Sequence, residues 1–440
     1  MIRGYSIRLD NCKQSVVPRA LAAPSQTGPG AQEAGRHAIL LLCFTIAMTE
    51  GYDLQAAAVG APQLRTDLAI EPGLMGWIFS SGTLGLLIGA AVGGRLSDRF
   101  GRKPALLVSV AIFGLLSVAA AFVQSAEQLL ACRVAIGVGM GGTLPNLIAI
   151  ATEATPPEQR ARSVAIVIGG MCVGGALVSL FGLHLAAPGS WRTLFLIGGV
   201  TPLILCIPLG LIRIRRRTAG VVQLTVTPIA TALFAERRMA GTLLLWAASF
   251  LVLISVYLLA NWLPTLLIER GLDRHSALWV QVAFNLAGVL GGLGSGWLLD
   301  RPTLRTRGIL FVYFIYIGSL FLLARTAADL ALLMAAGAAV GAATTAVSAV
   351  QYALAPALYP TEIRGTGVGF AVAVGRLGSV AGPLIGGFLL GAGFSGGDVL
   401  VAMLPITALA AISAILLSRS LRANERPPCS GREIAPPRST

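Results

Sequence analysis

The sequence predicts an all-α membrane protein with twelve transmembrane helices, arranged as two six-helix pseudo-symmetric halves. Three observations support this fold class: the composition is strongly apolar, twelve apolar runs have the length of a membrane span, and two pairs of motifs repeat at nearly one offset. Only 12% of the 440 residues are charged, whereas a soluble domain carries about 25%. So much apolar surface needs contact with a lipid bilayer.

Apolar runs of transmembrane length recur along the whole chain, since a helix needs about 20 mostly apolar residues to cross a bilayer. The predicted spans are 37–62, 74–95, 104–123, 126–152, 162–185, 192–212, 240–268, 275–299, 308–325, 329–355, 364–392 and 397–418. They define an N-terminal half at 37–212, a cytoplasmic linker at 213–239 and a C-terminal half at 240–418. Residues 1–36 and 419–440 are expected to be disordered cytoplasmic tails because they lack such runs.

Two motifs occur once in each half. The segment GRLSDR at 94–99 corresponds to GWLLDR at 296–301, with an offset of 202 residues. The segment that begins EQR at Glu158 corresponds to EIR at Glu362, with an offset of 204 residues. Two matched pairs at nearly one offset indicate two homologous halves. Such repeats around a midplane site are typical of alternating-access transporters.

The net charge of +14 reflects where the basic residues lie along the chain. With a cytoplasmic N-terminus, most Lys and Arg residues fall in the tails, the linker and the cytoplasmic connections, as the positive-inside rule requires. The remaining ones are Arg65, Arg192, Arg270, Arg274 and Arg325 in the outer connections, and Arg133 and Arg376 inside helices. This distribution predicts a cell inner membrane protein with both termini cytoplasmic, and it explains the charge without a nucleic-acid partner.

Several kinds of site are missing from the sequence. The six cysteines form no CxxC pair or metal-like cluster, so we expect no disulfide framework and no metal. There is no P-loop that would bind ATP and no nucleophile–base set of an enzyme. We therefore expect a monomeric protein that is not an enzyme and has no cofactor, with the proton as coupling ion.

Two acidic residues, Glu50 and Asp53, lie within the first apolar span. They are three residues apart and so share one helix face. A carboxylate within a membrane helix is costly and usually marks a functional path, and burial favours its protonated form. We interpret both as proton-coupling residues. The alternative is that Asp53 caps a helix break beside Gly51.

Two basic residues, Arg133 and Arg376, also lie deep in predicted spans. At ~1.5 Å per residue, Arg133 lies ~10 Å from the outer face and Arg376 ~18 Å from the inner face. Both depths are close to that of Asp53. An Arg fork matches a carboxylate, so we expect Arg376 to hold an anionic substrate. The alternatives are that Arg133 extends to the outer interface and that Arg376 bridges structurally to Glu50 or Asp53.

Three motifs resemble signatures of the major facilitator superfamily, and they cover both halves. They are GGRLSDRFGRK at 93–103, RVAIGVGMG at 133–141 and YPTEIRGTGVG at 359–369. A narrower resemblance is to the aromatic acid:proton symporter family, and within it to the 3-(3-hydroxyphenyl)propionate transporters. It rests on EGYDLQAAAVGAP at 50–62, MGWIFSSGTLGLLIGA at 75–90, TLPNLIAIATEA at 143–154 and NWLPTLL at 261–267. Many members have Asp in place of Glu50, and the fifth helix lacks the Gly-Pro signature of antiporters, which favours symport.

The resemblance implies roles for further residues. It implies that Arg133 couples to the acid of the first helix, and that the first, fourth, seventh and tenth helices line the substrate cavity. Besides Arg376, the candidate substrate contacts on these helices are Tyr52, Asn146, Tyr257, Asn261, Gln351 and Tyr352. The alternative for each of these six is ordinary packing between helices.

The loop motif indicates a conformational gate. Gly94 and Gly101 allow close approach and a sharp turn, and Asp98 can accept from Arg99 or Arg102 or lie at a helix N-terminus. The equivalent gate residues of the second half are Asp300 and Arg301, and the motif after the tenth helix adds Glu362 and Arg364. Such contacts would hold the outward-facing state and release in the inward-facing one. The alternative is solvated surface charge.

The leading hypothesis is a proton-coupled symporter that imports a small aromatic carboxylate, hydroxyphenylpropionate- or hydroxybenzoate-like, by alternating access. One alternative keeps the fold and changes the cargo to an aliphatic acid, a sugar or a drug. Another is a sensor or a membrane-embedded enzyme. The sequence does not determine which aromatic acid is carried.

Overall fold

The computed structural model describes residues 29–185, 187–212, 233–234, 238–299, 305–326, 329–360 and 363–425. Within these ranges the chain folds into helices and turns, and no strand occurs. Twelve helices are long and apolar enough to cross a membrane. The predicted all-α class and the predicted number of spans are confirmed.

The first half contains five continuous spans and one broken span. The continuous helices are α1 (Pro29–Asp67), α2 (Pro72–Phe100), α3 (Arg102–Ala120), α6 (Arg160–His184) and α7 (Trp191–Leu211). The fourth span consists of α4 (Ala126–Gly141) and α5 (Thr143–Ala154). The break lies at Gly142, where the side chain of Asn146 donates a hydrogen bond of 2.8 Å to the backbone carbonyl.

The second half contains six continuous spans. These helices are α9 (Met239–Glu269), α10 (Arg274–Leu299), α11 (Arg305–Arg325), α12 (Leu330–Leu358), α13 (Arg364–Gly391) and α14 (Gly396–Glu425). Asp329 caps α12 by accepting a hydrogen bond from the backbone N–H of Leu332, as its position before the helix favours.

Two helices extend into the predicted tails. Helix α1 begins at Pro29, inside the predicted N-terminal tail, and α14 continues to Glu425, inside the predicted C-terminal tail. Hydropathy marks only the part of a helix that lies in lipid, whereas backbone hydrogen bonds can continue beyond it. The rest of the predicted tails and most of the predicted linker, at 1–28, 213–232 and 426–440, lie outside the described residues.

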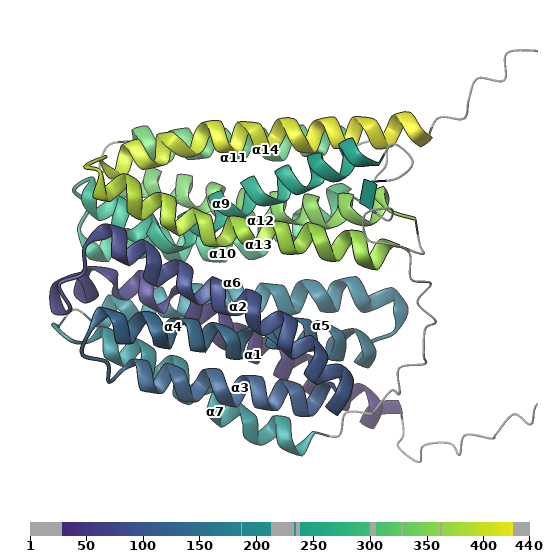
Figure 1. Cartoon of the computed structure of the whole chain (residues 1–440), viewed down its shortest axis with the longest axis horizontal. Helices are drawn as coiled ribbons and strands as arrows, with labels where there is room; N and C mark the ends of the chain where they lie inside the picture. The colour runs from purple at the N-terminus through teal and green to yellow at the C-terminus, as the bar shows by residue number, and fades with distance from the viewer. Residues whose placement is uncertain are drawn as a thin grey trace, which may run out of the picture.

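Helices α1 to α7 and α9 to α14 form two bundles (Figure 1), and the same helix pairs approach closely in both. The first and fifth helices of each half pack through glycine. A Cβ built on Gly174 of α6 would lie 2.0 Å from the carbonyl oxygen of Met48, and one on Gly378 of α13 would lie 2.2 Å from that of Phe250. The second and fourth helices of each half, α2 with α4 and α10 with α12, approach equally closely. The repeated pairing supports the predicted pseudo-symmetry.

The two bundles meet near one end of the molecule, which we call the loop end because it carries the connections 68–71 and 270–273. There α2 packs against α13, and the hydroxyl of Ser80 donates a hydrogen bond of 2.7 Å to the carbonyl of Val380. Arg65 and Glu269 form an ion pair of 3.3 Å across the halves. These contacts close the loop end.

The bundles separate toward the opposite end, the termini end, where α1 begins and α14 ends (Figure 1). A Cβ built on Gly94 of α2, or on Gly365 or Gly369 of α13, would meet nothing within 4 Å. The same two helices are in contact at the loop end. The interface between the halves is therefore closed at the loop end and open at the termini end.

Candidate functional site

An ion pair is buried inside the N-terminal half, between Asp53 of α1 and Arg133 of α4. The guanidinium donates to the Asp53 carboxylate at 3.1 Å, to the Asp53 backbone carbonyl at 3.1 Å and to the Leu54 carbonyl at 3.4 Å. Asp53 is 0% exposed and Arg133 1% exposed. Gly82 of α2 leaves room for the guanidinium, because a Cβ there would lie 3.1 Å from it.

The other carboxylate oxygen of Asp53 is also occupied, because the hydroxyl of Ser117 on α3 donates to it. One acid thus ties together α1, α3 and α4. Ser117 was not predicted from the sequence, where it is one of two serines within the apolar run 104–123. Such a polar side chain in an apolar span is itself a signal, since it needs a partner when it is buried.

The ion pair decides between alternatives left open by the sequence. Arg133 does not extend to the outer interface, because its guanidinium is buried against Asp53. Asp53 does not cap a helix break, because α1 runs without interruption from Pro29 to Asp67. Both alternatives are wrong. Removing one partner of such a buried pair leaves an uncompensated charge, which costs about 3–5 kcal/mol.

Glu50 lies one turn before Asp53 in α1 and has a different environment. It is 1% exposed, and its Oε2 atom has no hydrogen-bond partner within the described ranges of the chain. It interacts electrostatically with Asp53 in its own helix and with Arg376 in the other half, although no ion-pair contact with Arg376 is formed. Glu50 is therefore a buried acid without a fixed partner, directed toward the interface between the halves.

Arg376 of α13 is the corresponding cation of the C-terminal half. Its guanidinium donates a hydrogen bond of 3.0 Å to the hydroxyl of Tyr257 on α9. Within the described part of the chain, no carboxylate is in ion-pair contact with it. The alternative of a structural bridge from Arg376 to Glu50 or Asp53 is thus not formed at contact distance. Asn261 donates to the backbone carbonyl of Tyr257 at 2.8 Å and lies one turn beyond it.

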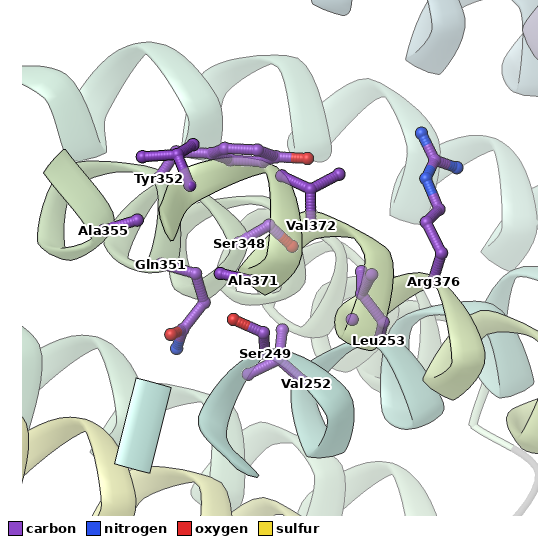
Figure 2. Close-up of a pocket in the computed structure, with 12 residues that line it drawn as sticks. Ser249, Val252, Leu253, Ser348, Gln351, Tyr352, Ala355, Ala371, Val372 and Arg376 are labelled. Carbon is purple, nitrogen blue, oxygen red and sulfur yellow. The ribbon is translucent and has the colours of Figure 1, made fainter. Parts of the chain in front are cut away.

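A pocket with an empty volume of about 450 Å³ begins at Arg376 and extends between α9, α12 and α13 (Figure 2). Most of its walls are apolar, formed by residues such as Val252, Leu253, Ala371 and Val372. Of the predicted substrate contacts, Arg376, Gln351 and Tyr352 line this pocket, and Tyr257 contacts Arg376. The structure thus brings together four of the five predicted residues of the second half, whereas Asn261 does not line this pocket and its contact with substrate stays a prediction.

Two predicted substrate contacts of the first half lie elsewhere. Tyr52 is 5% exposed and packs edge-to-face on Phe181, with ring centroids 6.1 Å apart. Asn146 accepts a hydrogen bond of 2.7 Å from Ser97 and so joins α5 to α2. Neither residue lines the pocket at Arg376, and their contact with substrate stays a prediction.

The predicted gate residues of the first half lie at the termini end. Gly101 has a φ of +92°, a left-handed conformation that favours glycine, and it joins α2 to α3. Asp98 is exposed and pairs with neither Arg99 nor Arg102, because Arg102 forms an ion pair of 2.7 Å with Glu153 of α5. A released Asp98 is expected where this end is open. The contact that Asp98 would make in a state closed at the termini end stays a prediction.

The gate residues of the second half are described only in part. Asp300, Arg301 and Glu362 lie outside the described residues. Arg364 begins α13 and donates a hydrogen bond of 3.5 Å to the backbone carbonyl of Tyr359. Their predicted gating roles remain predictions.

A cluster of three amides joins the two halves and was missed by the sequence analysis; Gln281 and Asn285 are buried and Gln55 is half-buried. Gln55 of α1 donates to Asn285 of α10 at 2.9 Å and accepts from it at 3.0 Å. Gln281 of α10 donates to Gln55 at 2.7 Å. A Cβ on Gly175 of α6 would lie 2.2 Å from the Gln55 amide nitrogen, so a larger residue there would displace the amides of the cluster. Amides within apolar spans are the signal that could have revealed it.

An aromatic contact closes the same interface nearer the loop end. Trp262 of α9 is fully buried, and its indole N–H donates a hydrogen bond of 2.9 Å to the carbonyl of Pro383. Phe79 of α2 packs edge-to-face on it, with ring centroids 4.9 Å apart. Trp262 lies within the motif NWLPTLL, so that motif contributes to the closed loop end.

The described residues form twelve spans in two bundles whose interface is closed at one end. Arg376, with no described carboxylate in contact, lies beside an apolar pocket. These features and the family match that follows define a multi-pass membrane transporter rather than an enzyme. The family model of the Major Facilitator Superfamily matches residues 42–329 and 245–438. The chain belongs to this superfamily.

Individual relatives agree with this assignment. The chain is 41% identical over 382 residues to the 3-(3-hydroxyphenyl)propionate transporter of Escherichia coli K12, covering 87% of this chain and 94% of that protein. It is 32% identical over 421 residues to the gallate transporter of Pseudomonas putida, covering 88% and 93%. Among solved structures, a bacterial homologue of the human lysosomal transporter Spinster matches with a TM-score of 0.71 at 19% identity, covering 91% of this chain and all of that one.

Proposed function

We propose that this protein is a proton-coupled symporter that imports a small aromatic carboxylate by alternating access. It acts as a monomer in the cell inner membrane, with both termini in the cytoplasm. The observation that carries the proposal is Arg376, a cation that lies beside an apolar pocket without a carboxylate in contact. The names of the relatives, which include transporters of 3-(3-hydroxyphenyl)propionate, gallate and 4-hydroxybenzoate, support an aromatic acid as cargo.

The substrate carboxylate binds Arg376 and the hydroxyl of Tyr257. A guanidinium presents paired donors that match a carboxylate, and the two side chains are already in contact. The aromatic ring then lies against the apolar walls at Val252, Leu253 and Val372. Pockets for small organic ligands commonly combine such walls with a few fixed polar groups.

Proton coupling follows from competition for Arg376. In the empty transporter, Glu50 is the carboxylate of the opposite half that interacts electrostatically with Arg376. When the substrate carboxylate binds Arg376, a second carboxylate nearby becomes unfavourable, because like charges in a poorly solvated site repel each other. Glu50 therefore takes up a proton as the substrate binds, and one proton accompanies one anion.

Asp53 is the second proton-coupling acid. While it is ionised it holds Arg133 and accepts from Ser117. Protonation would remove the charge that holds the guanidinium and so loosen the contacts that join α1, α3 and α4. Because Glu50 is on the same helix, a change at either acid can be transmitted to the other through α1.

Alternating access requires the loop end to open and the termini end to close. The amide cluster and the contact of Phe79 with Trp262 join the two halves, and these contacts must break in the outward-open state. Asp98 and Arg99 of the first half, and Asp300, Arg301, Glu362 and Arg364 of the second half, would then form the contacts that close the termini end.

A flux assay in proteoliposomes tests this function. The purified protein is reconstituted, a pH gradient that is acidic outside is imposed, and uptake of 3-(3-hydroxyphenyl)propionate, benzoate and glucose is measured together with internal pH. We expect uptake of the aromatic acids with internal acidification, no uptake of glucose, and loss of accumulation when a protonophore collapses the gradient. Gradient-driven glucose uptake, or aromatic acid uptake without proton movement, would contradict the proposal.

A further inference from the structure

The pocket at Arg376 has polar groups of a second kind at its other end. Ser249 of α9 and Gln351 of α12 line the same pocket. Figure 2 shows Arg376 on one side of the pocket, with Ser249 and Gln351 on the other and apolar residues such as Val372 and Leu253 between them. The two ends are therefore suited to different parts of one ligand.

Gln351 has one amide atom fixed and one unpaired. Its Nε2 donates a hydrogen bond of 3.2 Å to the hydroxyl of Tyr313, which is 2% exposed. The Oε1 atom is buried and has no hydrogen-bond partner among the residues that the structure describes, and the whole residue is 7% exposed. A buried polar atom without a partner is unusual in folded proteins and calls for an explanation. Here it is an acceptor that awaits a donor.

Ser249 complements this acceptor with a donor. Serines within helices commonly donate to a backbone carbonyl of the preceding turn, as Ser348 does to Thr344 at 2.9 Å and Ser255 to Leu251 at 3.4 Å. Ser249 is buried and makes no hydrogen bond in the described part of the chain. Figure 2 shows its hydroxyl directed toward Gln351.

We infer that Ser249 and Gln351 form the subsite for a hydroxyl group on the aromatic ring, an inference that rests on the proposed function. A phenolic O–H is both a donor and an acceptor. It donates to the Oε1 atom of Gln351 and accepts from the hydroxyl of Ser249. Both groups then have a partner, and the carboxylate of the same molecule binds Arg376.

The separation of the two ends selects the length of the ligand. Ser249 lies eight residues before Tyr257 in α9, which corresponds to ~12 Å along the helix axis. The hydroxyl of Tyr257 contacts Arg376, so the carboxylate end and the hydroxyl end lie well apart. The substrate class is therefore a ring-hydroxylated acid whose carboxylate is carried on a short chain, as in a hydroxyphenylpropionate, in preference to an acid attached directly to the ring.

The test compares two acids that differ only in the ring hydroxyl. Uptake of 3-(3-hydroxyphenyl)propionate and 3-phenylpropionate is measured in proteoliposomes for the wild type, Ser249→Ala and Gln351→Met. We expect the wild type to prefer the hydroxylated acid about tenfold in kcat/KM. Each variant should lower this preference by roughly 3- to 10-fold, the effect of one hydrogen bond, through a higher KM for the hydroxylated acid only. Uptake of 4-hydroxybenzoate by the wild type tests the expected length of the ligand. We expect this shorter acid to be taken up more weakly than 3-(3-hydroxyphenyl)propionate.

A matched control and the preference ratio keep the test decisive. Ser255→Ala makes the same change on α9 at a serine outside the pocket, and it should keep the wild-type preference. Because the preference is a ratio, a variant that folds poorly loses uptake of both acids and leaves the ratio unchanged. A wild type that takes up both acids equally, or variants that keep its preference, would overturn the subsite. A wild type that takes up no aromatic acid would instead overturn the proposed function.

Discussion

The two charged sites of this transporter contain the same kinds of side chain but differ in how they are satisfied. At Asp53 and Arg133, the acid and the base are in direct contact, both carboxylate oxygens are occupied and all partners belong to one half. At Glu50 and Arg376, the acid and the base belong to different halves and do not form a contact pair. We call the first the closed site, because its acid and base pair with each other. We call the second the open site, because no described carboxylate is in contact with Arg376, which lies beside a pocket.

This difference indicates which site can bind cargo. A carboxylate that enters the Asp53 site would have to displace an internal partner that makes several hydrogen bonds. A carboxylate that reaches Arg376 displaces only a distant electrostatic interaction. Separating the two sites therefore lets one ion pair hold the N-terminal half together while the other cation stays available for an anion.

The largest expected effect is at the closed site. Arg133→Met leaves the Asp53 carboxylate buried without its counter-charge, and we expect a loss of about 3–5 kcal/mol in the free energy of unfolding. Thermal unfolding in detergent checks this through a lowered midpoint. The double variant Asp53→Asn with Arg133→Met should recover much of the loss, because no unpaired charge remains. Arg95→Met, at an exposed arginine, serves as control. A stable single variant would show that the pair is not a structural unit.

We expect a substitution at the open site to change the binding of the aromatic acid rather than the stability of the protein. Arg376→Ala removes the cation that receives the carboxylate, and hydrogen bonds to charged groups contribute about 1.5–3 kcal/mol. We expect the dissociation constant of the aromatic acid to rise by roughly 10- to 150-fold, with the unfolding midpoint nearly unchanged. Binding is measured by calorimetry in detergent, with Arg419→Ala at the exposed termini end as control. The uncharged amide of the same acid should bind the wild type and Arg376→Ala equally weakly. Unchanged affinity for the acid would remove Arg376 from the substrate site.

Neutralising the unpaired acid should separate transport from the proton gradient. Glu50→Gln cannot take up or release a proton, so we expect substrate exchange to continue while concentrative uptake is lost. With one proton per anion, the wild type should accumulate substrate about tenfold per pH unit of gradient, which corresponds to ~1.4 kcal/mol. Glu50→Gln should reach no accumulation, whereas Glu71→Gln, at an exposed acid, should behave as the wild type. Gradient-driven accumulation by Glu50→Gln would assign coupling to another group.

The smallest effect is expected at the amide cluster that closes the loop end. Gln55→Leu removes its hydrogen bonds with Asn285 and Gln281, which we expect to favour the loop-end-open state by about 1 kcal/mol, or roughly fivefold. The distance between spin labels at Thr66 and His275, which lie on opposite halves, measures this opening. We expect Gln55→Leu to show a larger share of long distances. Gln128→Leu changes an amide outside the interface and should leave the distances unchanged. The same distance distribution in Gln55→Leu and the wild type would show that the cluster does not hold the loop end closed.

Much of the scaffold could be predicted from the sequence. The number of spans and the two halves follow from hydropathy and motif spacing, and depth along a helix placed Asp53 and Arg133 near one level. The coupling of Arg133 to the acid of the first helix was implied by the family resemblance, and the two side chains form an ion pair. Depth is proportional to residue number at ~1.5 Å per residue, so charges at one level can be recognised before the fold is known. Arg376 was placed near the same level for the same reason.

Partners across helices could not be predicted in this way. Arg102 had Asp98 as its nearest acid in sequence, yet it pairs with Glu153 of α5. Ser117 completes the Asp53 site from a helix about which the sequence analysis made no functional prediction. In both cases the choice depends on how a helix is rotated about its axis and on which neighbour faces it.

The sequence by itself determined the class of this protein, the approximate depth of each ionisable side chain and the division into two halves, because these properties depend on order along the chain. Only the tertiary structure decided that Arg133 forms an ion pair while no carboxylate of the described residues contacts Arg376, that three amides join the halves, and that Ser249 and Gln351 share a pocket. A helix that is apolar on nearly every side carries little information about its own rotation. Which of its few polar groups meet is therefore settled by packing against the neighbouring helices.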